Sequence, residues 1–166
     1  MLKKKGWFYD LDTIGLRYFN VFGPRQDANG AYAAVVPLFI KNILGDNSPT
    51  INGNGENSRD FTFIDNVIQA NILAIFAKEE SNNQIYNVAC GERKSLNQLF
   101  QTIKKNAVGL GVNCSKIKPV FGQPRSGDIP HSLASVEKAR KLLKYEPLVQ
   151  FDEGIKKTVR WHLSNQ

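Results

Sequence analysis

The stretch TIGLRYFNVFGPRQ, residues 13–26, decides the fold class of this chain. Its first part, TIGLRYFNV, is rich in aromatic and branched residues, which is typical of a β-strand, and the strand ends in the turn GPRQ. A second run, QIYNVA at residues 84–89, has the same character and predicts another strand. The end of the first strand and the turn after it contain polar side chains that can hold a ligand.

Helical patterns lie between and after these strands. Residues 35–44, VVPLFIKNIL, predict one helix, and a second helix is predicted to open with a capping box of Ser95 and Gln98. A third helix is predicted from Asp65 onward, because three apolar residues follow at helical spacing: Ile68, Ile72 and Ile75.

Two more helices are predicted near the end of the chain. SVEKARKLL, residues 135–143, has Ser135 as its expected N-cap, and FDEGIKKTVRWHL, residues 151–163, has Asp152 in that role. Short strands are predicted at two further places: residues 49–53 and 116–121. Strands and helices thus alternate along the sequence, which indicates an α/β protein.

The composition restricts the class of protein and its partners. Apolar residues make up 42% and charged residues 22% of the chain, as in ordinary globular proteins, and no apolar run approaches the roughly 20 residues of a membrane span. No secretory signal is recognised, so we expect a cytoplasmic protein without a membrane partner. The net charge of +7 favours anionic partners. Because no basic helix with interleaved aromatic residues is present, we expect no binding to nucleic acid.

The cysteines and histidines do not form a metal-binding pattern. Cys90 and Cys114 lie in different segments without the spacing of metal ligands, so we expect two free thiols. His131 and His162 have no partner motif. The sequence therefore predicts no metal site.

Polar residues are concentrated beside glycine in three segments: residues 17–26, 51–61 and 121–132. Loops at strand ends are where α/β proteins place their ligand contacts. Two arginines from these segments, Arg59 and Arg125, could converge on one diphosphate and form charge-assisted hydrogen bonds with it. The alternative is that each arginine pairs with a nearby carboxylate, Asp60 or Asp128.

Four long segments resemble one protein family: residues 13–40, 51–71, 85–100 and 124–147. In order and content they resemble the C-terminal half of NAD-dependent nucleotide-sugar epimerases, within the extended short-chain dehydrogenase/reductase group. The likeness is greatest to UDP-N-acetylglucosamine 4-epimerases of bacterial surface-polysaccharide pathways. It implies an α/β fold with the last strands of a Rossmann-type parallel sheet and a small C-terminal α/β lobe that binds the substrate.

The resemblance also implies roles for single residues in the last two polar segments. Arg59 and Arg125 would clamp the diphosphate of a UDP-sugar, and Asp128 would bond the ribose. Asn52 would approach the uracil, and Ser132 would face the sugar.

Residues near the first strand receive roles from the same resemblance. Asn20 would contact the phosphates or the sugar, and Gln26 and Ala34 would flank the sugar and the uridine. Tyr18 and Val21 would lie beside the nicotinamide of NAD.

The motifs that carry the chemistry of this family are missing from the sequence. Such an enzyme needs a glycine-rich dinucleotide fingerprint and, as its general base, a tyrosine four residues before a lysine. None of the 5 tyrosines has a lysine four residues later, and GNGENS at residues 53–58 departs from G-x-G-x-x-G. We therefore assign no catalytic residue, and we expect that NAD, the cofactor of the intact family, is not bound by this chain alone.

Residues 1–166 are interpreted as a single truncated unit, the UDP-sugar-binding portion of a 4-epimerase for UDP-N-acetylglucosamine or UDP-glucose that is inactive alone. Two alternatives stay open: a stand-alone sugar-nucleotide-binding module, and half of a related UDP-sugar decarboxylase or dehydratase. The first strand would normally pair with a neighbour on its missing N-terminal side. We therefore also expect self-association, or association with a separate N-terminal chain.

Overall fold

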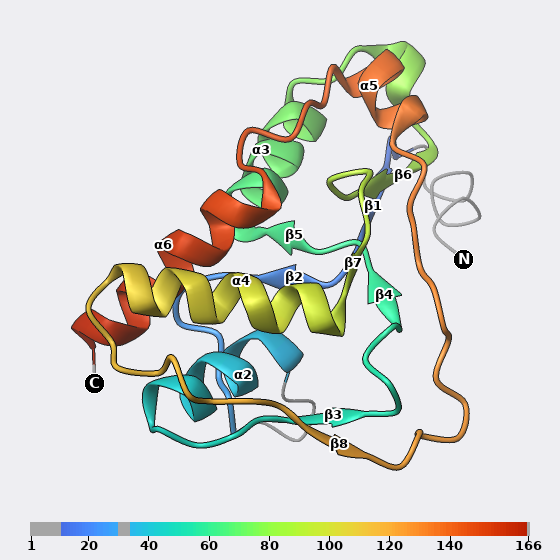
Figure 1. Cartoon of the computed structure of the whole chain (residues 1–166). Helices are drawn as coiled ribbons and strands as arrows, with labels where there is room; N and C mark the ends of the chain where they lie inside the picture. The colour runs from blue at the N-terminus through green and yellow to red at the C-terminus, as the bar shows by residue number, and fades with distance from the viewer. Residues whose placement is uncertain (1–10, 30–33, 166) are drawn as a thin grey trace. The chain divides into compact units, whose positions relative to one another are not determined.

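The computed structural model describes residues 11–29 and 34–165, and the chain divides into two compact units (Figure 1). Unit 1 comprises Met1–Val21, Asp60–Glu92 and Leu133–Gln150, and unit 2 comprises Phe22–Arg59, Arg93–Ser132 and Phe151–Gln166. Helices and strands alternate along the chain, which confirms the α/β class predicted from the sequence.

Two parallel strands form the centre of unit 1. β1 (Ile14–Tyr18) and β6 (Gln84–Val88) lie side by side, with Leu16 opposite Tyr86 at the middle of the pair (Figure 1). Parallel neighbours need a crossover of about a dozen residues or more, usually a helix, and the chain supplies one between these strands. Both strand predictions are confirmed, and the parallel pairing is that of a Rossmann-type sheet.

Helices α3 (Ile64–Ile75) and α5 (Glu137–Leu143) pack against this pair of strands. The two-residue strand β5 (Thr62–Phe63) leads directly into α3, and the short 3-10 helix η1 (Glu79–Ser81) precedes β6. Small and branched residues with two tyrosines make up the core of unit 1: Val67, Ala70, Tyr86, Val88, Ala89, Ala134, Val136, Ala139, Leu143 and Tyr145.

Three helices form the core of unit 2. α2 (Val35–Leu44), α4 (Leu96–Gly109) and α6 (Phe151–Ser164) pack on one another (Figure 1). Their facing side chains are apolar and buried: Val36, Phe39, Ile40, Ile43, Leu99, Phe100, Ile103, Phe151, Ile155 and Val159. The helices predicted for this part of the sequence are therefore confirmed.

Helix starts were predicted with mixed success. The capping box of α4 is confirmed: the Gln98 N–H donates to Ser95 Oγ at 3.2 Å, and the Ser95 N–H donates to Gln98 Oε1 at 2.8 Å. The prediction of Ser135 as the cap of α5 is wrong, because Val136 occupies that position and the Ser135 carbonyl instead accepts a bond from the Asn87 amide. Asp152 is also not a cap: it lies in the first turn of α6, where its charge still favours the helix dipole.

Four short strands complete unit 2 in two pairs. β3 (Thr50–Asn52) runs parallel to β8 (Val120–Gly122), and β4 (Ser58–Arg59) runs antiparallel to β7 (Lys94–Ser95). One more two-residue strand, β2 (Val21–Phe22), spans the point where the chain first leaves unit 1. Because β3 and β8 are parallel, the loops that follow these two strands begin side by side in unit 2.

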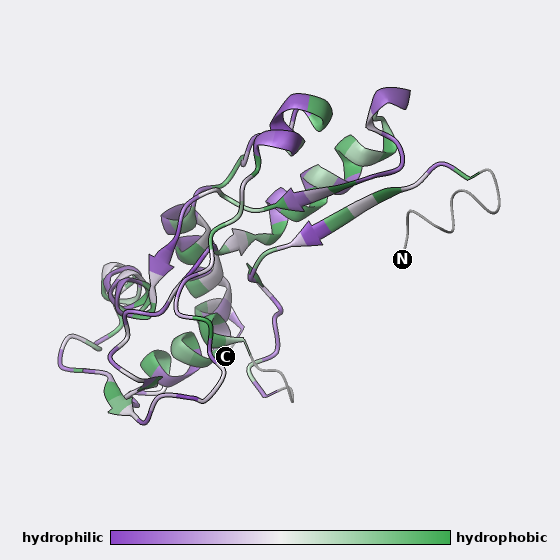
Figure 2. Ribbon diagram, turned by 90° about the vertical axis from the view of Figure 1, so that its right-hand side faces the viewer, coloured by the Kyte–Doolittle hydropathy of each residue, from purple (hydrophilic) through white to green (hydrophobic). Residues whose placement is uncertain are grey.

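Helix α3 has apolar residues on two sides. Val67 and Ala70 face the core of unit 1, whereas the isoleucines whose spacing predicted the helix are exposed: Ile72 is 51% exposed and Ile75 is 75% exposed. Phe76, which follows the helix, is 81% exposed. Figure 2 colours the ribbon by hydropathy, and apolar (green) stretches are visible on several of the helices. The helical spacing is confirmed, but the face that it marks is not the buried one.

Candidate functional site

A cavity lies at the carboxyl ends of β3 and β8, and we call it the β3–β8 cavity. Its volume is about 660 Å³, and its lining combines glycines, two amides and an aromatic ring: Gly53, Asn54, Asn57, Phe121, Gly122 and Pro124. Ligands of α/β proteins bind outside the carboxyl ends of parallel strands, which is where this cavity is placed. The predicted ligand Asn52 is the last residue of β3 and lies opposite Gly122.

A glycine turn after β3 forms one wall of this cavity. Gly55 has φ 78°, and a Cβ added there would collide with the side chain of Asn97, so only glycine fits this position. Asn97 fixes the turn by donating to the Asn54 carbonyl at 3.0 Å and to Glu56 Oε1 at 2.7 Å. The turn then leads into β4, the strand that carries Arg59.

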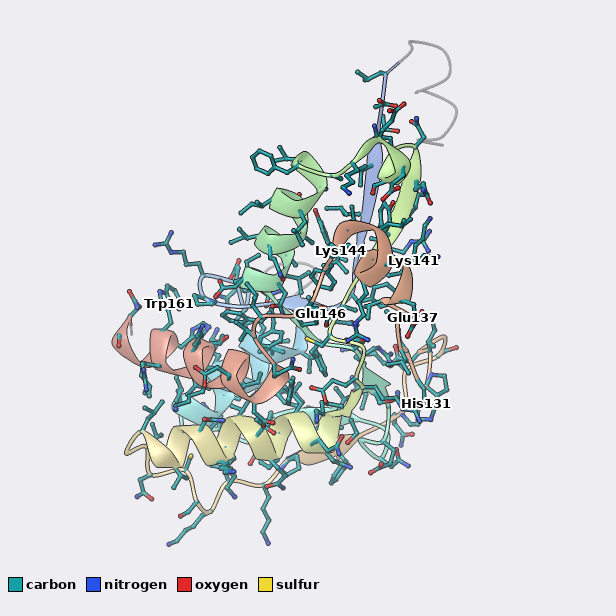
Figure 3. All side chains as sticks on the ribbon, turned by 90° about the horizontal axis from the view of Figure 1, so that it is seen from above. His131, Glu137, Lys141, Lys144, Glu146 and Trp161 are labelled. Atoms are coloured by element: carbon teal, nitrogen blue, oxygen red, sulfur yellow. The ribbon has the colours of Figure 1, made fainter. Side chains whose placement is uncertain are left out.

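A second cavity lies at β4, and we call it the β4 cavity. It has a volume of about 450 Å³ and a polar lining: Glu56, Ser58, Arg93, Ser95, Asn97, Gln98 and His131. The hydroxyl of Ser58 lies 2.9 Å from His131 Nδ1. Figure 3 shows His131 on the segment that runs beside β4.

Arg59 is half-buried, and its guanidinium is held by backbone carbonyls. Its Nη1 donates to the Ser58 carbonyl at 2.9 Å and to the Pro130 carbonyl at 3.4 Å. Among the described residues, Arg59 forms no ion pair, and the neighbouring Asp60 carboxylate instead accepts bonds from backbone N–H groups. The alternative pairing of Arg59 with Asp60 is therefore not formed.

Arg125 and Asp128 close one exposed turn. The Asp128 N–H donates to the Arg125 carbonyl at 3.3 Å. Gly127 has a positive φ of 85°, which this turn requires and which glycine adopts without strain. In the part of the chain that the structure describes, neither side chain has an ion-pair partner. The alternative pairing of Arg125 with Asp128 is likewise not formed.

Asp60 is fully buried in unit 1 and acts as an acceptor for main-chain donors. Its carboxylate accepts bonds from the N–H groups of Cys90 at 3.0 Å, Gly91 at 3.1 Å and Ala134 at 3.4 Å. Burial raises the pKa of this carboxyl above 3.8, although the three donors oppose the rise. Burial also raises the pKa of the Cys90 thiol to about 11, with Asp60 as a smaller cause. Cys90 is therefore an unreactive thiol at neutral pH.

The residues predicted beside the nicotinamide and the sugar lie at the end of β1 in unit 1. The Tyr18 hydroxyl exchanges hydrogen bonds with the amide of Asn71 at 3.1 and 3.2 Å. Asn20 has φ 36°, which asparagine tolerates, and its amide donates to the Asp60 carbonyl at 3.0 Å. Val21 packs against the core of unit 1. Their assignment to NAD and substrate stays a prediction.

Gln26 and Ala34 lie elsewhere in unit 2 than the β3–β8 cavity. Gln26 lines a third cavity of about 640 Å³, together with Trp161 and His162 from α6, and Ala34 is the residue before α2. Ser132 lies beside β4, because its N–H donates to the Ser58 carbonyl at 3.0 Å. Ser132 thus lies beside β4, the strand that carries Arg59, and Asn52 directly precedes Gly53 of the β3–β8 cavity, whereas Gln26 lines a separate cavity.

Sequence reasoning missed two kinds of site residue. Asn54 and Asn57 line the β3–β8 cavity, and their position in the glycine turn was the only available signal. The contact between Ser58 and His131 joins residues 73 positions apart, so no local pattern could reveal it.

The described residues do not offer a site for the pyrophosphate of NAD. A dinucleotide site needs glycines where a strand turns into a helix, so that the phosphates can approach the helix start. The two described strands that run directly into helices, β5 and β7, have no glycine at that turn, and the start of α4 is already capped by Ser95. NAD would have to find its phosphate contacts elsewhere.

The described residues contain neither a candidate metal cluster nor a candidate membrane-spanning helix. No group of three or more histidines, cysteines, aspartates or glutamates lies close enough to hold a metal ion. None of the described helices combines the length and the apolar character needed to cross a membrane.

Known proteins with similar sequences are sugar-nucleotide enzymes. The UDP-glucose 4-epimerase of Mycolicibacterium smegmatis is 36% identical over 92% of this chain and 46% of that protein. The UDP-N-acetyl-alpha-D-glucosaminuronate decarboxylase of Bacillus cytotoxicus is 29% identical over 88% of this chain and 44% of that protein. The solved structure of UDP-N-acetylglucosamine 4-epimerase from Methanobrevibacter ruminantium, in complex with UDP-N-acetylmuramic acid, is 40% identical and superposes with a TM-score of 0.89 over 99% of this chain and 50% of that chain.

The chain spans about half the length of the curated relatives that it matches. The fold, the parallel strand pair and the similar structures agree on one assignment, and a family model matches residues 6–89, about half of the sequence. This chain belongs to the NAD dependent epimerase/dehydratase family.

Proposed function

We propose that this chain is the UDP-sugar-binding portion of a nucleotide-sugar 4-epimerase for surface-polysaccharide synthesis. Two arginines, Arg59 and Arg125, form no ion pair within the described residues, so both cations are available to an anionic ligand. The planar guanidinium fork suits the oxygens of a diphosphate better than a lysine ammonium does. The two arginines are therefore the proposed diphosphate clamp.

The contact between Arg59 and the segment that bears Arg125 carries this proposal. The guanidinium of Arg59 donates to the Pro130 carbonyl, five residues beyond Arg125. Within the same segment, the Asp128 N–H donates to the Arg125 carbonyl. The two cations thus belong to hydrogen-bonded neighbouring segments of unit 2. We propose that both charges contact one diphosphate.

The β3–β8 cavity supports a nucleoside as the remaining part of the ligand. Its volume of about 660 Å³ lies within the range of roughly 300–1,000 Å³ that is typical of small-molecule sites. Asn54 and Asn57 offer amide donors and acceptors, which is what the edge of a uracil ring requires, and Phe121 offers an apolar surface. We propose that the uridine lies in this cavity.

Calorimetric titration of the purified chain with UDP tests the proposal. We expect binding, and we expect Arg59→Ala and Arg125→Ala each to weaken it by about tenfold or more, because each removes a charged hydrogen-bonding partner. Arg160→Ala on α6 is the matched control, since this exposed arginine lies on none of the segments that form the proposed site. Absence of any heat with UDP at millimolar concentration would refute the function.

We further propose that these 166 residues bind the substrate without converting it. No tyrosine precedes a lysine by four residues, so the general base of the family has no counterpart in the sequence. Chromatography of UDP-N-acetylglucosamine incubated with the chain and NAD should reveal no 4-epimer, and titration with NAD alone should give no heat. Turnover above a blank would contradict this part of the proposal.

The two alternatives predict different ligand preferences. A stand-alone module would bind UDP-sugars with the same affinity whether or not a partner polypeptide is present. Half of a decarboxylase would prefer a UDP-sugar with a carboxylate, an alternative that the similarity to the Bacillus cytotoxicus enzyme keeps open. A comparison of UDP-glucuronate with UDP-glucose by calorimetry separates it from an epimerase of UDP-glucose.

We also propose that unit 1 associates through β1 and the exposed side of α3. Among the described residues β1 pairs with β6 alone, so its other edge has unpaired backbone groups, and Ile72, Ile75 and Phe76 are exposed. The occupant that we propose is a polypeptide that extends the parallel sheet, corresponding to the other half of the relatives' length. In its absence, copies of this chain should associate with one another, which sedimentation velocity measures.

A further inference from the structure

Three polar atoms of Ser58 bind the same short segment, residues 130–132. The Ser58 N–H donates to the Pro130 carbonyl at 2.9 Å, and the Ser58 carbonyl accepts from the Ser132 N–H at 3.0 Å. The Ser58 hydroxyl lies 2.9 Å from His131 Nδ1. These bonds form an isolated parallel bridge between Ser58 and His131, although the two residues are 73 positions apart.

The same attachment determines where the guanidinium of Arg59 lies. Its Nη1 donates to the Ser58 carbonyl at 2.9 Å, so Arg59 and the Ser132 N–H share one acceptor. A second bond from Nη1 reaches the Pro130 carbonyl at 3.4 Å. Arg59 is therefore held by the two carbonyls that the bridge between Ser58 and His131 brings together.

We propose that Ser58 and His131 are positioning residues for the diphosphate site. Their side-chain hydrogen bond fixes residues 130–132 against β4, and this fixes the guanidinium of Arg59 and the backbone of Ser132. Ser58 is only 5% exposed, so its hydroxyl would otherwise be buried without a partner, and the bond is costly to lose. The name diphosphate site rests on the proposed UDP-sugar function, whereas the hydrogen bonds that position Arg59 do not depend on that function.

A catalytic serine–histidine pair explains this contact less well. A nucleophilic serine needs an accessible hydroxyl and a histidine that a third group orients. Ser58 is buried, and the carboxylate at the same cavity, Glu56, already accepts a bond from Asn97 at 2.7 Å. Within the described residues, no hydrogen-bond partner orients the other nitrogen of His131. Hydrolysis of an activated ester by the wild type, lost in Ser58→Ala, would favour the catalytic role and overturn the positioning role.

The binding test uses the full chain and UDP in calorimetry. We expect Ser58→Ala and His131→Ala each to weaken UDP binding by about three- to tenfold, the effect of losing one hydrogen bond. Ser58→Thr keeps the hydroxyl, and His131→Asn keeps a polar atom near the place of Nδ1, so both should bind UDP within about twofold of the wild type. Thermal melts of each variant confirm that the fold is retained.

A double-mutant cycle separates positioning from a general structural effect. If Ser58 acts through Arg59, then Ser58→Ala should have little further effect on UDP binding in the Arg59→Ala background. Full additivity of the two substitutions would overturn the proposal. Weaker UDP binding by Ser58→Ala than by Ser58→Thr, at equal melting temperatures, would support the positioning role.

A ligand-independent measurement keeps this inference distinct from the proposed function. Amide hydrogen exchange of Ser132, followed by NMR, should accelerate in Ser58→Ala and in His131→Ala, because the segment then opens more readily. If the wild type fails to bind UDP, the proposed function is wrong, and the exchange rates still judge the positioning role. Unchanged exchange at Ser132 in both variants would overturn it whatever the ligand.

Discussion

Helices α3 and α4 have the same kind of apolar spacing and opposite surroundings. Ile103 of α4 is 0% exposed and lies among α2, α4 and α6, whereas Ile72 of α3 is 51% exposed. The comparison teaches that helical periodicity identifies an apolar face without identifying what covers it. In unit 2 the cover is supplied by neighbouring helices, whereas in unit 1 the outer side of α3 is exposed within the described residues.

The largest expected effect comes from the same substitution in both helices. Ile103→Ala should lower the free energy of unfolding by about 3 kcal/mol, because it removes buried methyl groups and leaves a cavity. Ile72→Ala should change it by less than about 0.5 kcal/mol, as for other exposed positions. Urea titrations of the two variants measure both values. Equal losses would mean that the isoleucine of α3 is covered in solution.

The second-largest effect is the loss of stability caused by a substitution in the interior of unit 1, which is compared with the loss expected in the interior of unit 2. Asp60→Asn should destabilise the chain by about 2 kcal/mol, because an amide N–H₂ cannot accept, so at least one of the buried N–H groups of Cys90, Gly91 and Ala134 loses its acceptor. Gln69→Asn, a conservative change on α3, serves as a control of similar chemistry. A melting temperature unchanged by Asp60→Asn would show that the buried carboxylate contributes nothing net.

A smaller effect is expected on association than on folding. Ile72→Lys combined with Ile75→Lys should weaken self-association by about tenfold or more, since it places two charges on the exposed side of α3. The matched control is Val108→Lys on α4, because Val108 is an exposed apolar residue of unit 2, 45% exposed. Sedimentation velocity across a concentration series gives the comparison. A wild type that stays monomeric at high concentration contradicts the proposed association.

The smallest effect is a pH dependence that belongs to unit 2. Burial lowers the pKa of His162 below 6.5, so the unfolded chain takes up a proton at a higher pH than the folded chain does. The stability contributed by neutral His162 is complete above pH 6.5 and is lost as the pH falls below that value. The melting temperature of the wild type should therefore fall more between pH 7.5 and 5.5 than that of His162→Gln. Parallel curves for the two proteins would contradict this assignment.

Local features of the fold were readable from the sequence. The capping box of Ser95 and Gln98 is a contact between residues three apart, and the strands around residues 13–21 and 84–89 are marked by their own composition. The absence of an ion pair between Arg59 and Asp60 also follows from local geometry. Neighbouring residues of an extended segment point to opposite sides, so Arg59 and Asp60 could not easily pair.

Contacts between distant segments were beyond sequence reasoning. Nothing near Ser58 indicates His131, and nothing near Gln26 indicates the α6 residues that share its cavity. The starts of α5 and α6 were misplaced because a polar residue near a helix start can serve as a cap, lie in the first turn or bind another segment. Which of these occurs depends on tertiary contacts, such as the bond from Asn87 to the Ser135 carbonyl.

The glycine turn after β3 has a practical consequence for engineering ligand preference. At Gly55 a side chain would meet Asn97 and would be strained at φ 78°, so a mutant library that randomises this position would disturb the turn that Asn97 holds. Asn54 and Asn57 flank it and face the β3–β8 cavity. Diversity directed at those two asparagines, with Gly55 held constant, gives the most economical search for chains that accept a different base.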